Sequence, residues 1–162
     1  MNIRHPRQDE GGQVYQLIRK APPLDLNSEY LYHLLCIHHR LTCALAEEEG
    51  QIIGFVSSYL KPEEPDCVFI WQVAVAEAHR GKGVAGKLLD WLTSAAPLTE
   101  VRHLETTIGP TNLSSAALFQ KLAQRHGAQV RKSSFIGTHQ FSEPGHEEET
   151  LYHISPIQRT LA

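Results

Sequence analysis

Two neighbouring stretches decide the fold: Cys-Val-Phe-Ile-Trp-Gln-Val-Ala-Val at residues 67–75, and Arg-Gly-Lys-Gly-Val-Ala-Gly at residues 80–86. The first stretch is β-branched, aromatic and uncharged, which is typical of a strand that is buried on both faces. The second is rich in glycine and runs into a helical pattern that places Val84, Leu88 and Leu92 on one side. A strand, a glycine-rich turn and a helix in this order predict an α/β protein whose turn binds a ligand.

Working outward, the apolar spacing predicts further elements on both sides of this segment. The expected order is β-α-α-β-β-β-α-β-α-β-β, which predicts a mixed sheet with helices packed on its faces. Expected strands are residues 2–5, 42–47, 51–59, 67–75, 101–108, 128–135 and 149–154; expected helices are 13–20, one that begins near 27–28, 84–95 and 114–125.

The composition fits one globular domain that covers residues 1–162. Hydrophobic residues make up 41% of the chain and charged residues 20%, as in ordinary globular proteins. The formal net charge is −3, which argues against a nucleic-acid partner or an anionic membrane surface. No apolar stretch is long enough to span a bilayer, and residues 1–6 lack an apolar signal core, so a cytoplasmic location is expected.

Neither the cysteines nor the histidines are spaced as metal ligands. Cys36, Cys43 and Cys67 lack a Cys-x-x-Cys spacing, so we interpret them as buried thiols in a reducing compartment. His38 and His39 are adjacent; on a helix they point in directions about 100° apart and cannot share an ion. We therefore expect no metal site.

The glycine-rich turn matches two nucleotide-binding patterns. Gly81, Gly83 and Gly86 form Gly-x-Gly-x-x-Gly, and Glu105 lies where a ribose-binding acid would. A dinucleotide-binding turn, however, needs its first glycine at the end of the strand, whereas residues 76–80 separate Val75 from Gly81. We reject this interpretation.

The second pattern is Arg-x-x-Gly-x-Ala, formed by Arg80, Gly83 and Ala85. Small residues let backbone N–H groups converge, and the helix that follows adds its positive amino-terminal end. Together they predict a pyrophosphate cradle with Arg80 and Lys82 as nearby cations. The alternative is a tight turn whose glycines supply only backbone freedom. Asn112, at the start of a later helix, also has two interpretations: an N-cap, which is the commoner role of asparagine there, or a ligand contact.

With these motifs in place, the chain resembles the GNAT superfamily of N-acetyltransferases. Residues 73–75, the turn at 80–85 and residues 112–122 carry the resemblance. It implies a mixed α/β fold with a mostly antiparallel sheet of about seven strands, helices on both faces, and acetyl-CoA as co-substrate. It also implies a splayed strand whose backbone groups pair with pantetheine. The cofactor residues that it implies are Val73 and Val75 along the strand, Arg80, Gly81, Lys82, Gly83, Val84 and Ala85 in the cradle, and Asn112 and Phe119 on the later helix. Many members have a tyrosine near Phe119 that protonates the departing thiolate; phenylalanine cannot, so a water or another hydroxyl must serve.

A narrower resemblance, carried by residues 22–30, 69–75, 104–107 and 146–149, is to the diaminobutyrate acetyltransferases. It implies acetylation of the 4-amino group of L-2,4-diaminobutyrate to N4-acetyl-2,4-diaminobutyrate, a step of ectoine biosynthesis. A homodimer is expected from this resemblance alone.

A diamine substrate needs carboxylates for its ammonium groups, a donor for its carboxylate and apolar walls. We expect Asp25, Glu105 and Glu148 to bind the ammoniums, His146 to bind the carboxylate, and Trp71 and Tyr30 to form the walls. A side-chain ammonium has a pKa of about 10.4 and must lose a proton before it attacks. Glu105 is the first candidate for that base and Asp25 the second.

Each residue also has an ordinary structural alternative. Asp25 could cap a helix, Glu148 could belong to a solvated acidic run, and Trp71 could be sheet core. Glu105 could be an exposed strand residue, His146 a loop residue and Tyr30 a packing aromatic. Two other functions also remain open: acetylation of another small amine or polyamine, and acyl-CoA binding by a regulatory module without turnover.

Overall fold

The computed structural model describes residues 1–158 and contains a seven-stranded sheet in the order β1-β2-β3-β4-β5-β7-β6. Only β4 and β5 pair in parallel among these strands. The strands are β1 (Asn2–Arg4), β2 (Ala44–Glu48), β3 (Gln51–Lys61), β4 (Glu64–Val75), β5 (His103–Ile108), β6 (Gln129–Ile136) and β7 (Glu149–Ser155); the helices are α1 (Gly11–Arg19), α2 (Glu29–His38), α3 (Val84–Ser94) and α4 (Leu113–His126).

The predicted order of strands and helices is confirmed, and most boundaries shift by only one or two residues. The largest difference is at residues 60–66, between the strands expected at 51–59 and 67–75, where Pro62 and Pro65 favour a loop. There β3 and β4 extend toward a tight turn, and Lys61 pairs with Glu64. The Lys61 Nζ lies 2.8 Å from a Glu64 carboxylate oxygen, so the hairpin end is fastened by an ion pair.

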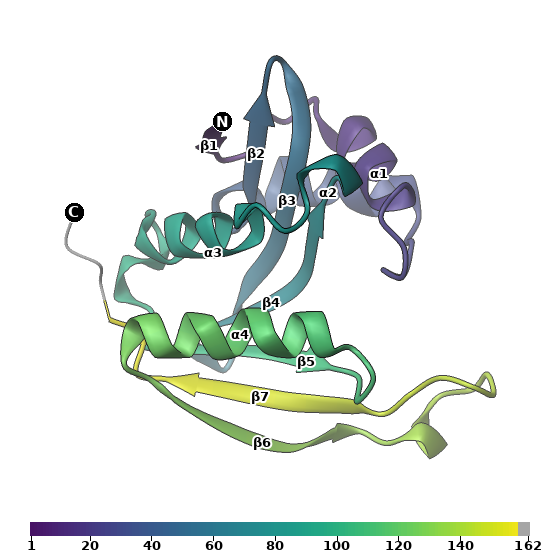
Figure 1. Cartoon of the computed structure of the whole chain (residues 1–162), viewed down its shortest axis with the longest axis vertical. Coiled ribbons are helices and arrows are strands. Elements are labelled where there is room, and N and C mark those ends of the chain that lie inside the picture. Colours follow the sequence, from purple (N-terminus) through teal and green to yellow (C-terminus); the bar gives the residue numbers. More distant parts are fainter. Residues whose placement is uncertain (159–162) are drawn as a thin grey trace.

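The helices cover the sheet on both sides, as the resemblance implied. One core cluster joins α3 and α4 to the sheet through Leu88, Leu92 and Leu122. The other joins α1 and α2 to it through Val14, Ile18 and Tyr32. Figure 1 shows α4 lying along β5 and β7. None of the helices within residues 1–158 is both long and apolar enough to cross a bilayer.

The sheet forks between β4 and β5. These two strands pair only from Cys67 to Ile70, opposite His103 to Thr106. In Figure 1, β2, β3 and β4 stand roughly upright, whereas β5, β6 and β7 lie across the view. At the fork the Thr106 hydroxyl donates to the Ile70 carbonyl over 3.0 Å. Beyond this bond, residues 71–75 of β4 have no partner on β5.

A β-bulge at Trp71 lies directly at this fork. Ser57 pairs with Gln72 and Ser58 with Ile70, so Trp71 is the extra residue. The bulge shifts the alternation of side chains along β4: Ile70 and, three residues later, Val73 both pack against the α3–α4 cluster. Because side chains alternate with a period of two, one inserted residue is required. The bulge thereby re-aims Trp71 and Gln72 at the point where the sheet opens.

Candidate active site at the fork of the sheet

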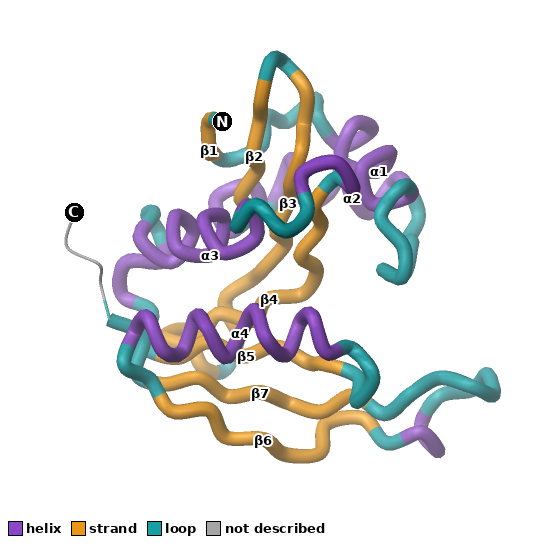
Figure 2. The backbone as a smooth tube through the Cα atoms, viewed as in Figure 1, coloured by secondary structure: helices purple, strands orange, loops and turns teal. Residues whose placement is uncertain are grey.

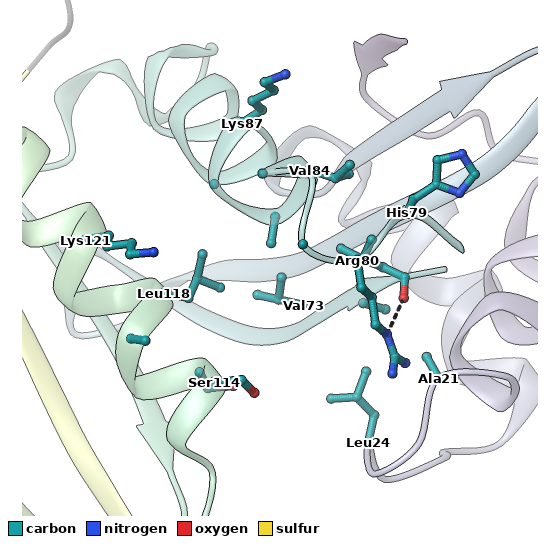
Figure 3. Close-up of a pocket in the computed structure, with 18 of the residues that line it drawn as sticks. Ala21, Leu24, Val73, His79, Arg80, Val84, Lys87, Ser114, Leu118 and Lys121 are labelled. Carbon is teal, nitrogen blue, oxygen red and sulfur yellow. Dashed lines mark hydrogen bonds between the residues drawn. The ribbon is translucent and has the colours of Figure 1, made fainter. Parts of the chain in front are cut away.

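A cavity of about 730 Å³ occupies the fork, and its lining supplies the predicted cradle. Figure 3 shows the cavity between α4, with Ser114, Leu118 and Lys121, and the segment that carries Ala21 and Leu24. Val73 lies between these two walls. The predicted cofactor residues that line it are Val73, Val75, Arg80, Gly81, Gly83, Val84, Ala85 and Asn112.

The turn that ends in α3 has the backbone that its glycines predicted. Gly81 and Gly83 have φ values of +74° and +76°, which L side chains rarely adopt. Neither glycine has a neighbour within 4 Å of the position that a Cβ would take. The glycines are therefore required by backbone conformation, and the space in front of the turn is free for a ligand.

The charge around this cavity is positive. Arg80, Lys87, Lys121 and Arg125 line it, and the one carboxylate among its lining residues, that of Asp90, accepts a 2.8 Å hydrogen bond from Arg125. Lys82, the second predicted cation, is exposed and does not line this cavity. A cavity with several cations at the start of a helix suits a ligand that carries phosphate groups.

The main-chain groups of Val73 and Val75 face the fork. The N–H groups of Gln72 and Ala76 both point to β3, where they donate to the Ser57 hydroxyl and the Ile53 carbonyl. Because successive residues of a strand present their N–H and C=O groups to opposite sides, those of Val73 and Val75 point away from β3. The Val75 carbonyl accepts a 3.2 Å hydrogen bond from Arg80 Nε. This edge can therefore pair with an extended ligand.

The structure shows Asn112 as an N-cap, and its contact with a ligand stays a prediction. Its side chain caps α4 by accepting a hydrogen bond of 3.2 Å from the N–H of Ser115. Asn112 also lines the cavity. Phe119, predicted beside it, is buried and lines a second cavity instead.

The second cavity, of about 740 Å³, joins the first and is lined by three of the six predicted acceptor residues. Six residues line both cavities: Pro23, Leu24, Val73, Asn112, Ser114 and Ser115. Asp25, Trp71 and His146 line the second one. Part of its wall comes from the segments at residues 20–28 and 137–148, which Figure 2 shows on the same side of the molecule, and most of the rest comes from β4, β5 and α4. Across it, His146 Nε2 lies 4.0 Å from an Asp25 carboxylate oxygen.

The acidic run at residues 147–149 contributes differently from the prediction. Glu147 and Glu149 line the second cavity, whereas Glu148 is exposed and does not. The chain there is extended as it enters β7, so alternate side chains share a face. This alternation is the signal that would have identified the two glutamates from the sequence.

Glu105 lies apart from both cavities, on the sheet between Lys61 and His153. Its carboxylate is 2.9 Å from Lys61 Nζ and accepts a 3.0 Å hydrogen bond from His153 Nδ1. Burial alone would raise the pKa of this carboxyl, but the bonds from Lys61 and His153 lower it below the ordinary value. A buried carboxylate that is already paired with an ammonium is placed to hold β5, β7 and the β3–β4 hairpin together.

The neighbouring Cys67 and Glu64 bring a thiol and a second carboxylate to the same cluster. Burial raises the pKa of Cys67 to about 12, so its sulfur is a thiol in the free protein. Lys61 supplies the cation of this cluster.

Tyr30 lies on the outer side of α2 and is 71% exposed. It lines neither cavity. Gln72, which the sequence analysis did not single out, is buried beside the second cavity and bonds to the loop that carries Asp25. A polar residue inside an otherwise apolar strand was the signal for it.

Comparison with known proteins gives a consistent result. Residues 12–123 match the model of the acetyltransferase (GNAT) family. The chain is 45% identical over 157 residues to the L-2,4-diaminobutyric acid acetyltransferase of Halomonas elongata, covering 96% of this chain and 81% of that protein. It is 39% identical over 154 residues to the enzyme of the same name from Virgibacillus pantothenticus, covering 95% and 97%.

The structure is similar to that of the diaminobutyrate acetyltransferase EctA from Paenibacillus lautus, solved in complex with its substrate L-2,4-diaminobutyric acid and coenzyme A. The TM-score is 0.93 at 37% identity, and the match covers 99% of this chain and 98% of that one.

Proposed function

The chain belongs to the GNAT acetyltransferase family, and we propose that it transfers the acetyl group of acetyl-CoA to the 4-amino group of L-2,4-diaminobutyrate. The products are N4-acetyl-2,4-diaminobutyrate and CoA, and the family resemblance makes this a step of ectoine biosynthesis. One observation carries the proposal: a cationic cavity and a cavity lined by carboxylates join at the fork, as transfer from an anionic donor to a cationic acceptor requires.

Acetyl-CoA fits the first cavity by its chemistry. The turn at Arg80–Ala85 would hold the pyrophosphate, and the edge of Val73 and Val75 would pair with pantetheine. The thioester would then reach the junction, where Val73 lines both cavities. A backbone N–H near Val73 would stabilise the oxyanion that forms there.

The diamine would occupy the second cavity, with its ammonium groups near Asp25, Glu147 and Glu149. The reacting ammonium loses its proton, its nitrogen attacks the thioester carbon, the C–N bond forms and the C–S bond breaks. Of the two carboxylates predicted as base, Asp25 opens onto this cavity and Glu105 does not. We therefore assign proton acceptance to Asp25 and a supporting role to Glu105.

The departing thiolate requires a proton that Phe119 cannot give. The hydroxyl groups of Ser114 and Ser115 line both cavities, at the junction where the sulfur would leave. We propose that one of these hydroxyls, or water bound by them, passes to the sulfur the second proton of the amine, which the nitrogen loses as the C–S bond breaks.

The test is a thiol-release assay with acetyl-CoA and L-2,4-diaminobutyrate, followed by mass spectrometry of the product. We expect stoichiometric release of thiol and acetylation of the 4-amino group. The free 2-amino group has the lower pKa and is the more abundant neutral amine in solution, so selectivity for the 4-amino group must come from positioning. Equal acetylation of both nitrogens would overturn the selective pocket. Turnover of a polyamine but not of diaminobutyrate would replace the proposed substrate, and binding of acetyl-CoA without turnover would replace the enzyme by a binding module.

We also propose that the protein is a homodimer and that it is cytoplasmic. Tyr30 and Ile37 are exposed on one face of α2, and exposed Leu41 follows the helix. Seven residues turn a helix by nearly two full turns, so this face forms an apolar stripe that a second copy can cover. The three cysteines are free and buried, which fits a reducing compartment.

A further inference from the structure

The loop that carries Asp25 lacks regular secondary structure, yet it must hold a carboxylate at the second cavity. Residues 22–24 line the first cavity and residues 23–25 the second. The Asp25 side chain is 88% exposed, so its own contacts do not fix its position. Bonds to the backbone of the loop must therefore hold it over β4.

Gln72 bonds to the loop from below. Its side chain is buried, and its Nε2 donates to the Asp25 backbone carbonyl over 2.7 Å. Its Oε1 accepts a 3.1 Å hydrogen bond from the Tyr32 hydroxyl. That hydroxyl in turn accepts a 3.3 Å hydrogen bond from the N–H of Asn27. The amide and the hydroxyl thus hold the loop at two points, one on each side of Leu26.

The bulge explains why Gln72 can do this. The shift of alternation at Trp71 turns Gln72 toward α2 and leaves its N–H bonded to the Ser57 hydroxyl. Trp71 and Val73, its two neighbours in the chain, line the second cavity. Residues 71–73 of β4 therefore supply two residues of the cavity wall and, between them, the side chain that holds the loop with Asp25.

We infer that Gln72 and Tyr32 act as one positioning unit that fixes the loop at residues 20–28, and with it Asp25, over the second cavity. By placing Asp25, this unit sets which of the two amino groups of the substrate reacts. The inference rests on the proposed function. Neither residue touches the reacting atoms in this scheme. Both act through the backbone of Asp25 and Asn27.

The test compares Tyr32→Phe with Tyr15→Phe. Each change removes one hydroxyl from the same pair of packed rings, whose centroids are 6.0 Å apart, but only Tyr32 bonds to the loop. In Tyr32→Phe we expect kcat/KM for diaminobutyrate to fall about tenfold, the change that loss of one or two buried hydrogen bonds produces. The ratio of 4-acetyl to 2-acetyl product should fall as well, while the Kd for acetyl-CoA stays the same. Tyr15→Phe should match the parent in all three.

A second variant, Gln72→Leu, removes the other half of the unit. Because the two residues act together, the double variant should be no worse than the worse single one. An unchanged product ratio in folded Tyr32→Phe and Gln72→Leu would overturn the inference.

Limited proteolysis with Asp-N, which cleaves before aspartate, follows the loop without reference to catalysis. Cleavage between Leu24 and Asp25 should be faster in Tyr32→Phe than in the parent or in Tyr15→Phe. If cleavage is faster in Tyr32→Phe but the enzyme prefers another amine, Gln72 and Tyr32 still hold the loop. In that case only the proposed substrate is rejected. Equal cleavage would reject the anchor itself.

Discussion

At the residue scale, Gly83 is where backbone geometry and ligand chemistry meet. Its positive φ and the open space in front of it leave the turn free for a pyrophosphate. Gly83→Glu places a negative charge there, and we expect it to abolish stabilisation by acetyl-CoA in a thermal shift assay. In the parent, ligand at ~100 Kd should add about 2.7 kcal/mol to the free energy of unfolding.

The matched control is Gly50→Glu. Gly50 has a φ of +77° and also has no neighbour within 4 Å of a Cβ. Both variants carry the same backbone strain, so their stabilities without ligand should fall alike. If Gly83→Glu kept the full response to acetyl-CoA, the turn would not be the pyrophosphate site.

A second prediction distinguishes Asp25 from Glu105 as the base that accepts the proton of the substrate. Asp25→Asn removes the basic oxygen from the acceptor cavity, and kcat should fall by ~10²–10⁴. Glu105→Gln leaves Lys61 and His153 facing a neutral amide and should lower the melting temperature while kcat stays close to that of the parent. Steady-state kinetics at saturating diamine decide the matter. A large loss of kcat in folded Glu105→Gln with little effect of Asp25→Asn would return the base to Glu105.

Gly83 and Glu105 show how much of the site could be predicted from the sequence at the residue scale. The glycine turn was predictable because φ and motif spacing are local properties. The surroundings of Glu105 were not, because Lys61 and His153 come from 44 and 48 positions away and only strand pairing brings them together. The roles of individual site residues stay predictions until they are tested.

At the scale of elements, β1, α1 and β2 are joined by one buried carboxylate. Glu10 is 1% exposed and receives hydrogen bonds of 2.8 and 2.7 Å from Arg4, which also bonds to Glu47 on β2. Burial alone would raise the pKa of Glu10, but the bonds from Arg4 and from the N–H of Arg7 lower it. A lowered pKa stabilises the fold above the unfolded value of about 4.3, and this contribution is lost as pH falls through the folded value.

We therefore expect Glu10→Gln to destabilise the protein by about 2–3 kcal/mol at pH 7. The difference from the parent should shrink below a pH of about 4.3, where Glu10 of the unfolded chain takes up a proton, and should vanish once the pH falls through the lowered pKa of the folded carboxylate. Urea unfolding at a series of pH values measures both effects. Asp9→Asn is the control, since its carboxylate is exposed and 3.9 Å from Arg7, and it should change little. A constant difference at all pH values would mean that the carboxylate charge contributes nothing.

The order of elements was predictable because each has a clear period and clear ends. The bulge at Trp71 was not. An uncharged apolar strand gives no alternation of its own, and the phase becomes visible only when Ile70 and Val73 are seen to pack on the same cluster. The length of the β3–β4 hairpin was missed because Pro62 and Pro65 indicated a loop.

At the scale of the whole molecule, the exposed apolar stripe of Tyr30, Ile37 and Leu41 leads to a prediction about dimerisation. We expect the parent to sediment as a species of twice 18.2 kDa and Tyr30→Lys/Ile37→Lys as a monomer. The four lysines that this double variant brings to a symmetric interface would repel one another and lack partners. Phe135→Lys changes an exposed aromatic on β6 and should leave the dimer intact. If Phe135→Lys alone dissociated it, the interface would lie on the sheet instead.

The fork has one more consequence, for the solvent that fills it. Elsewhere an unpaired strand edge is a place where chains aggregate, but here the edge at Val73 and Val75 is enclosed between α4 and the loop at residues 21–24. Only water or a narrow, extended ligand can form hydrogen bonds with the backbone groups of this edge. The amide protons of these two residues should therefore exchange with deuterium readily in the free protein and slowly once acetyl-CoA is bound, whereas the amide of Ala76, bonded to Ile53, should be protected in both states.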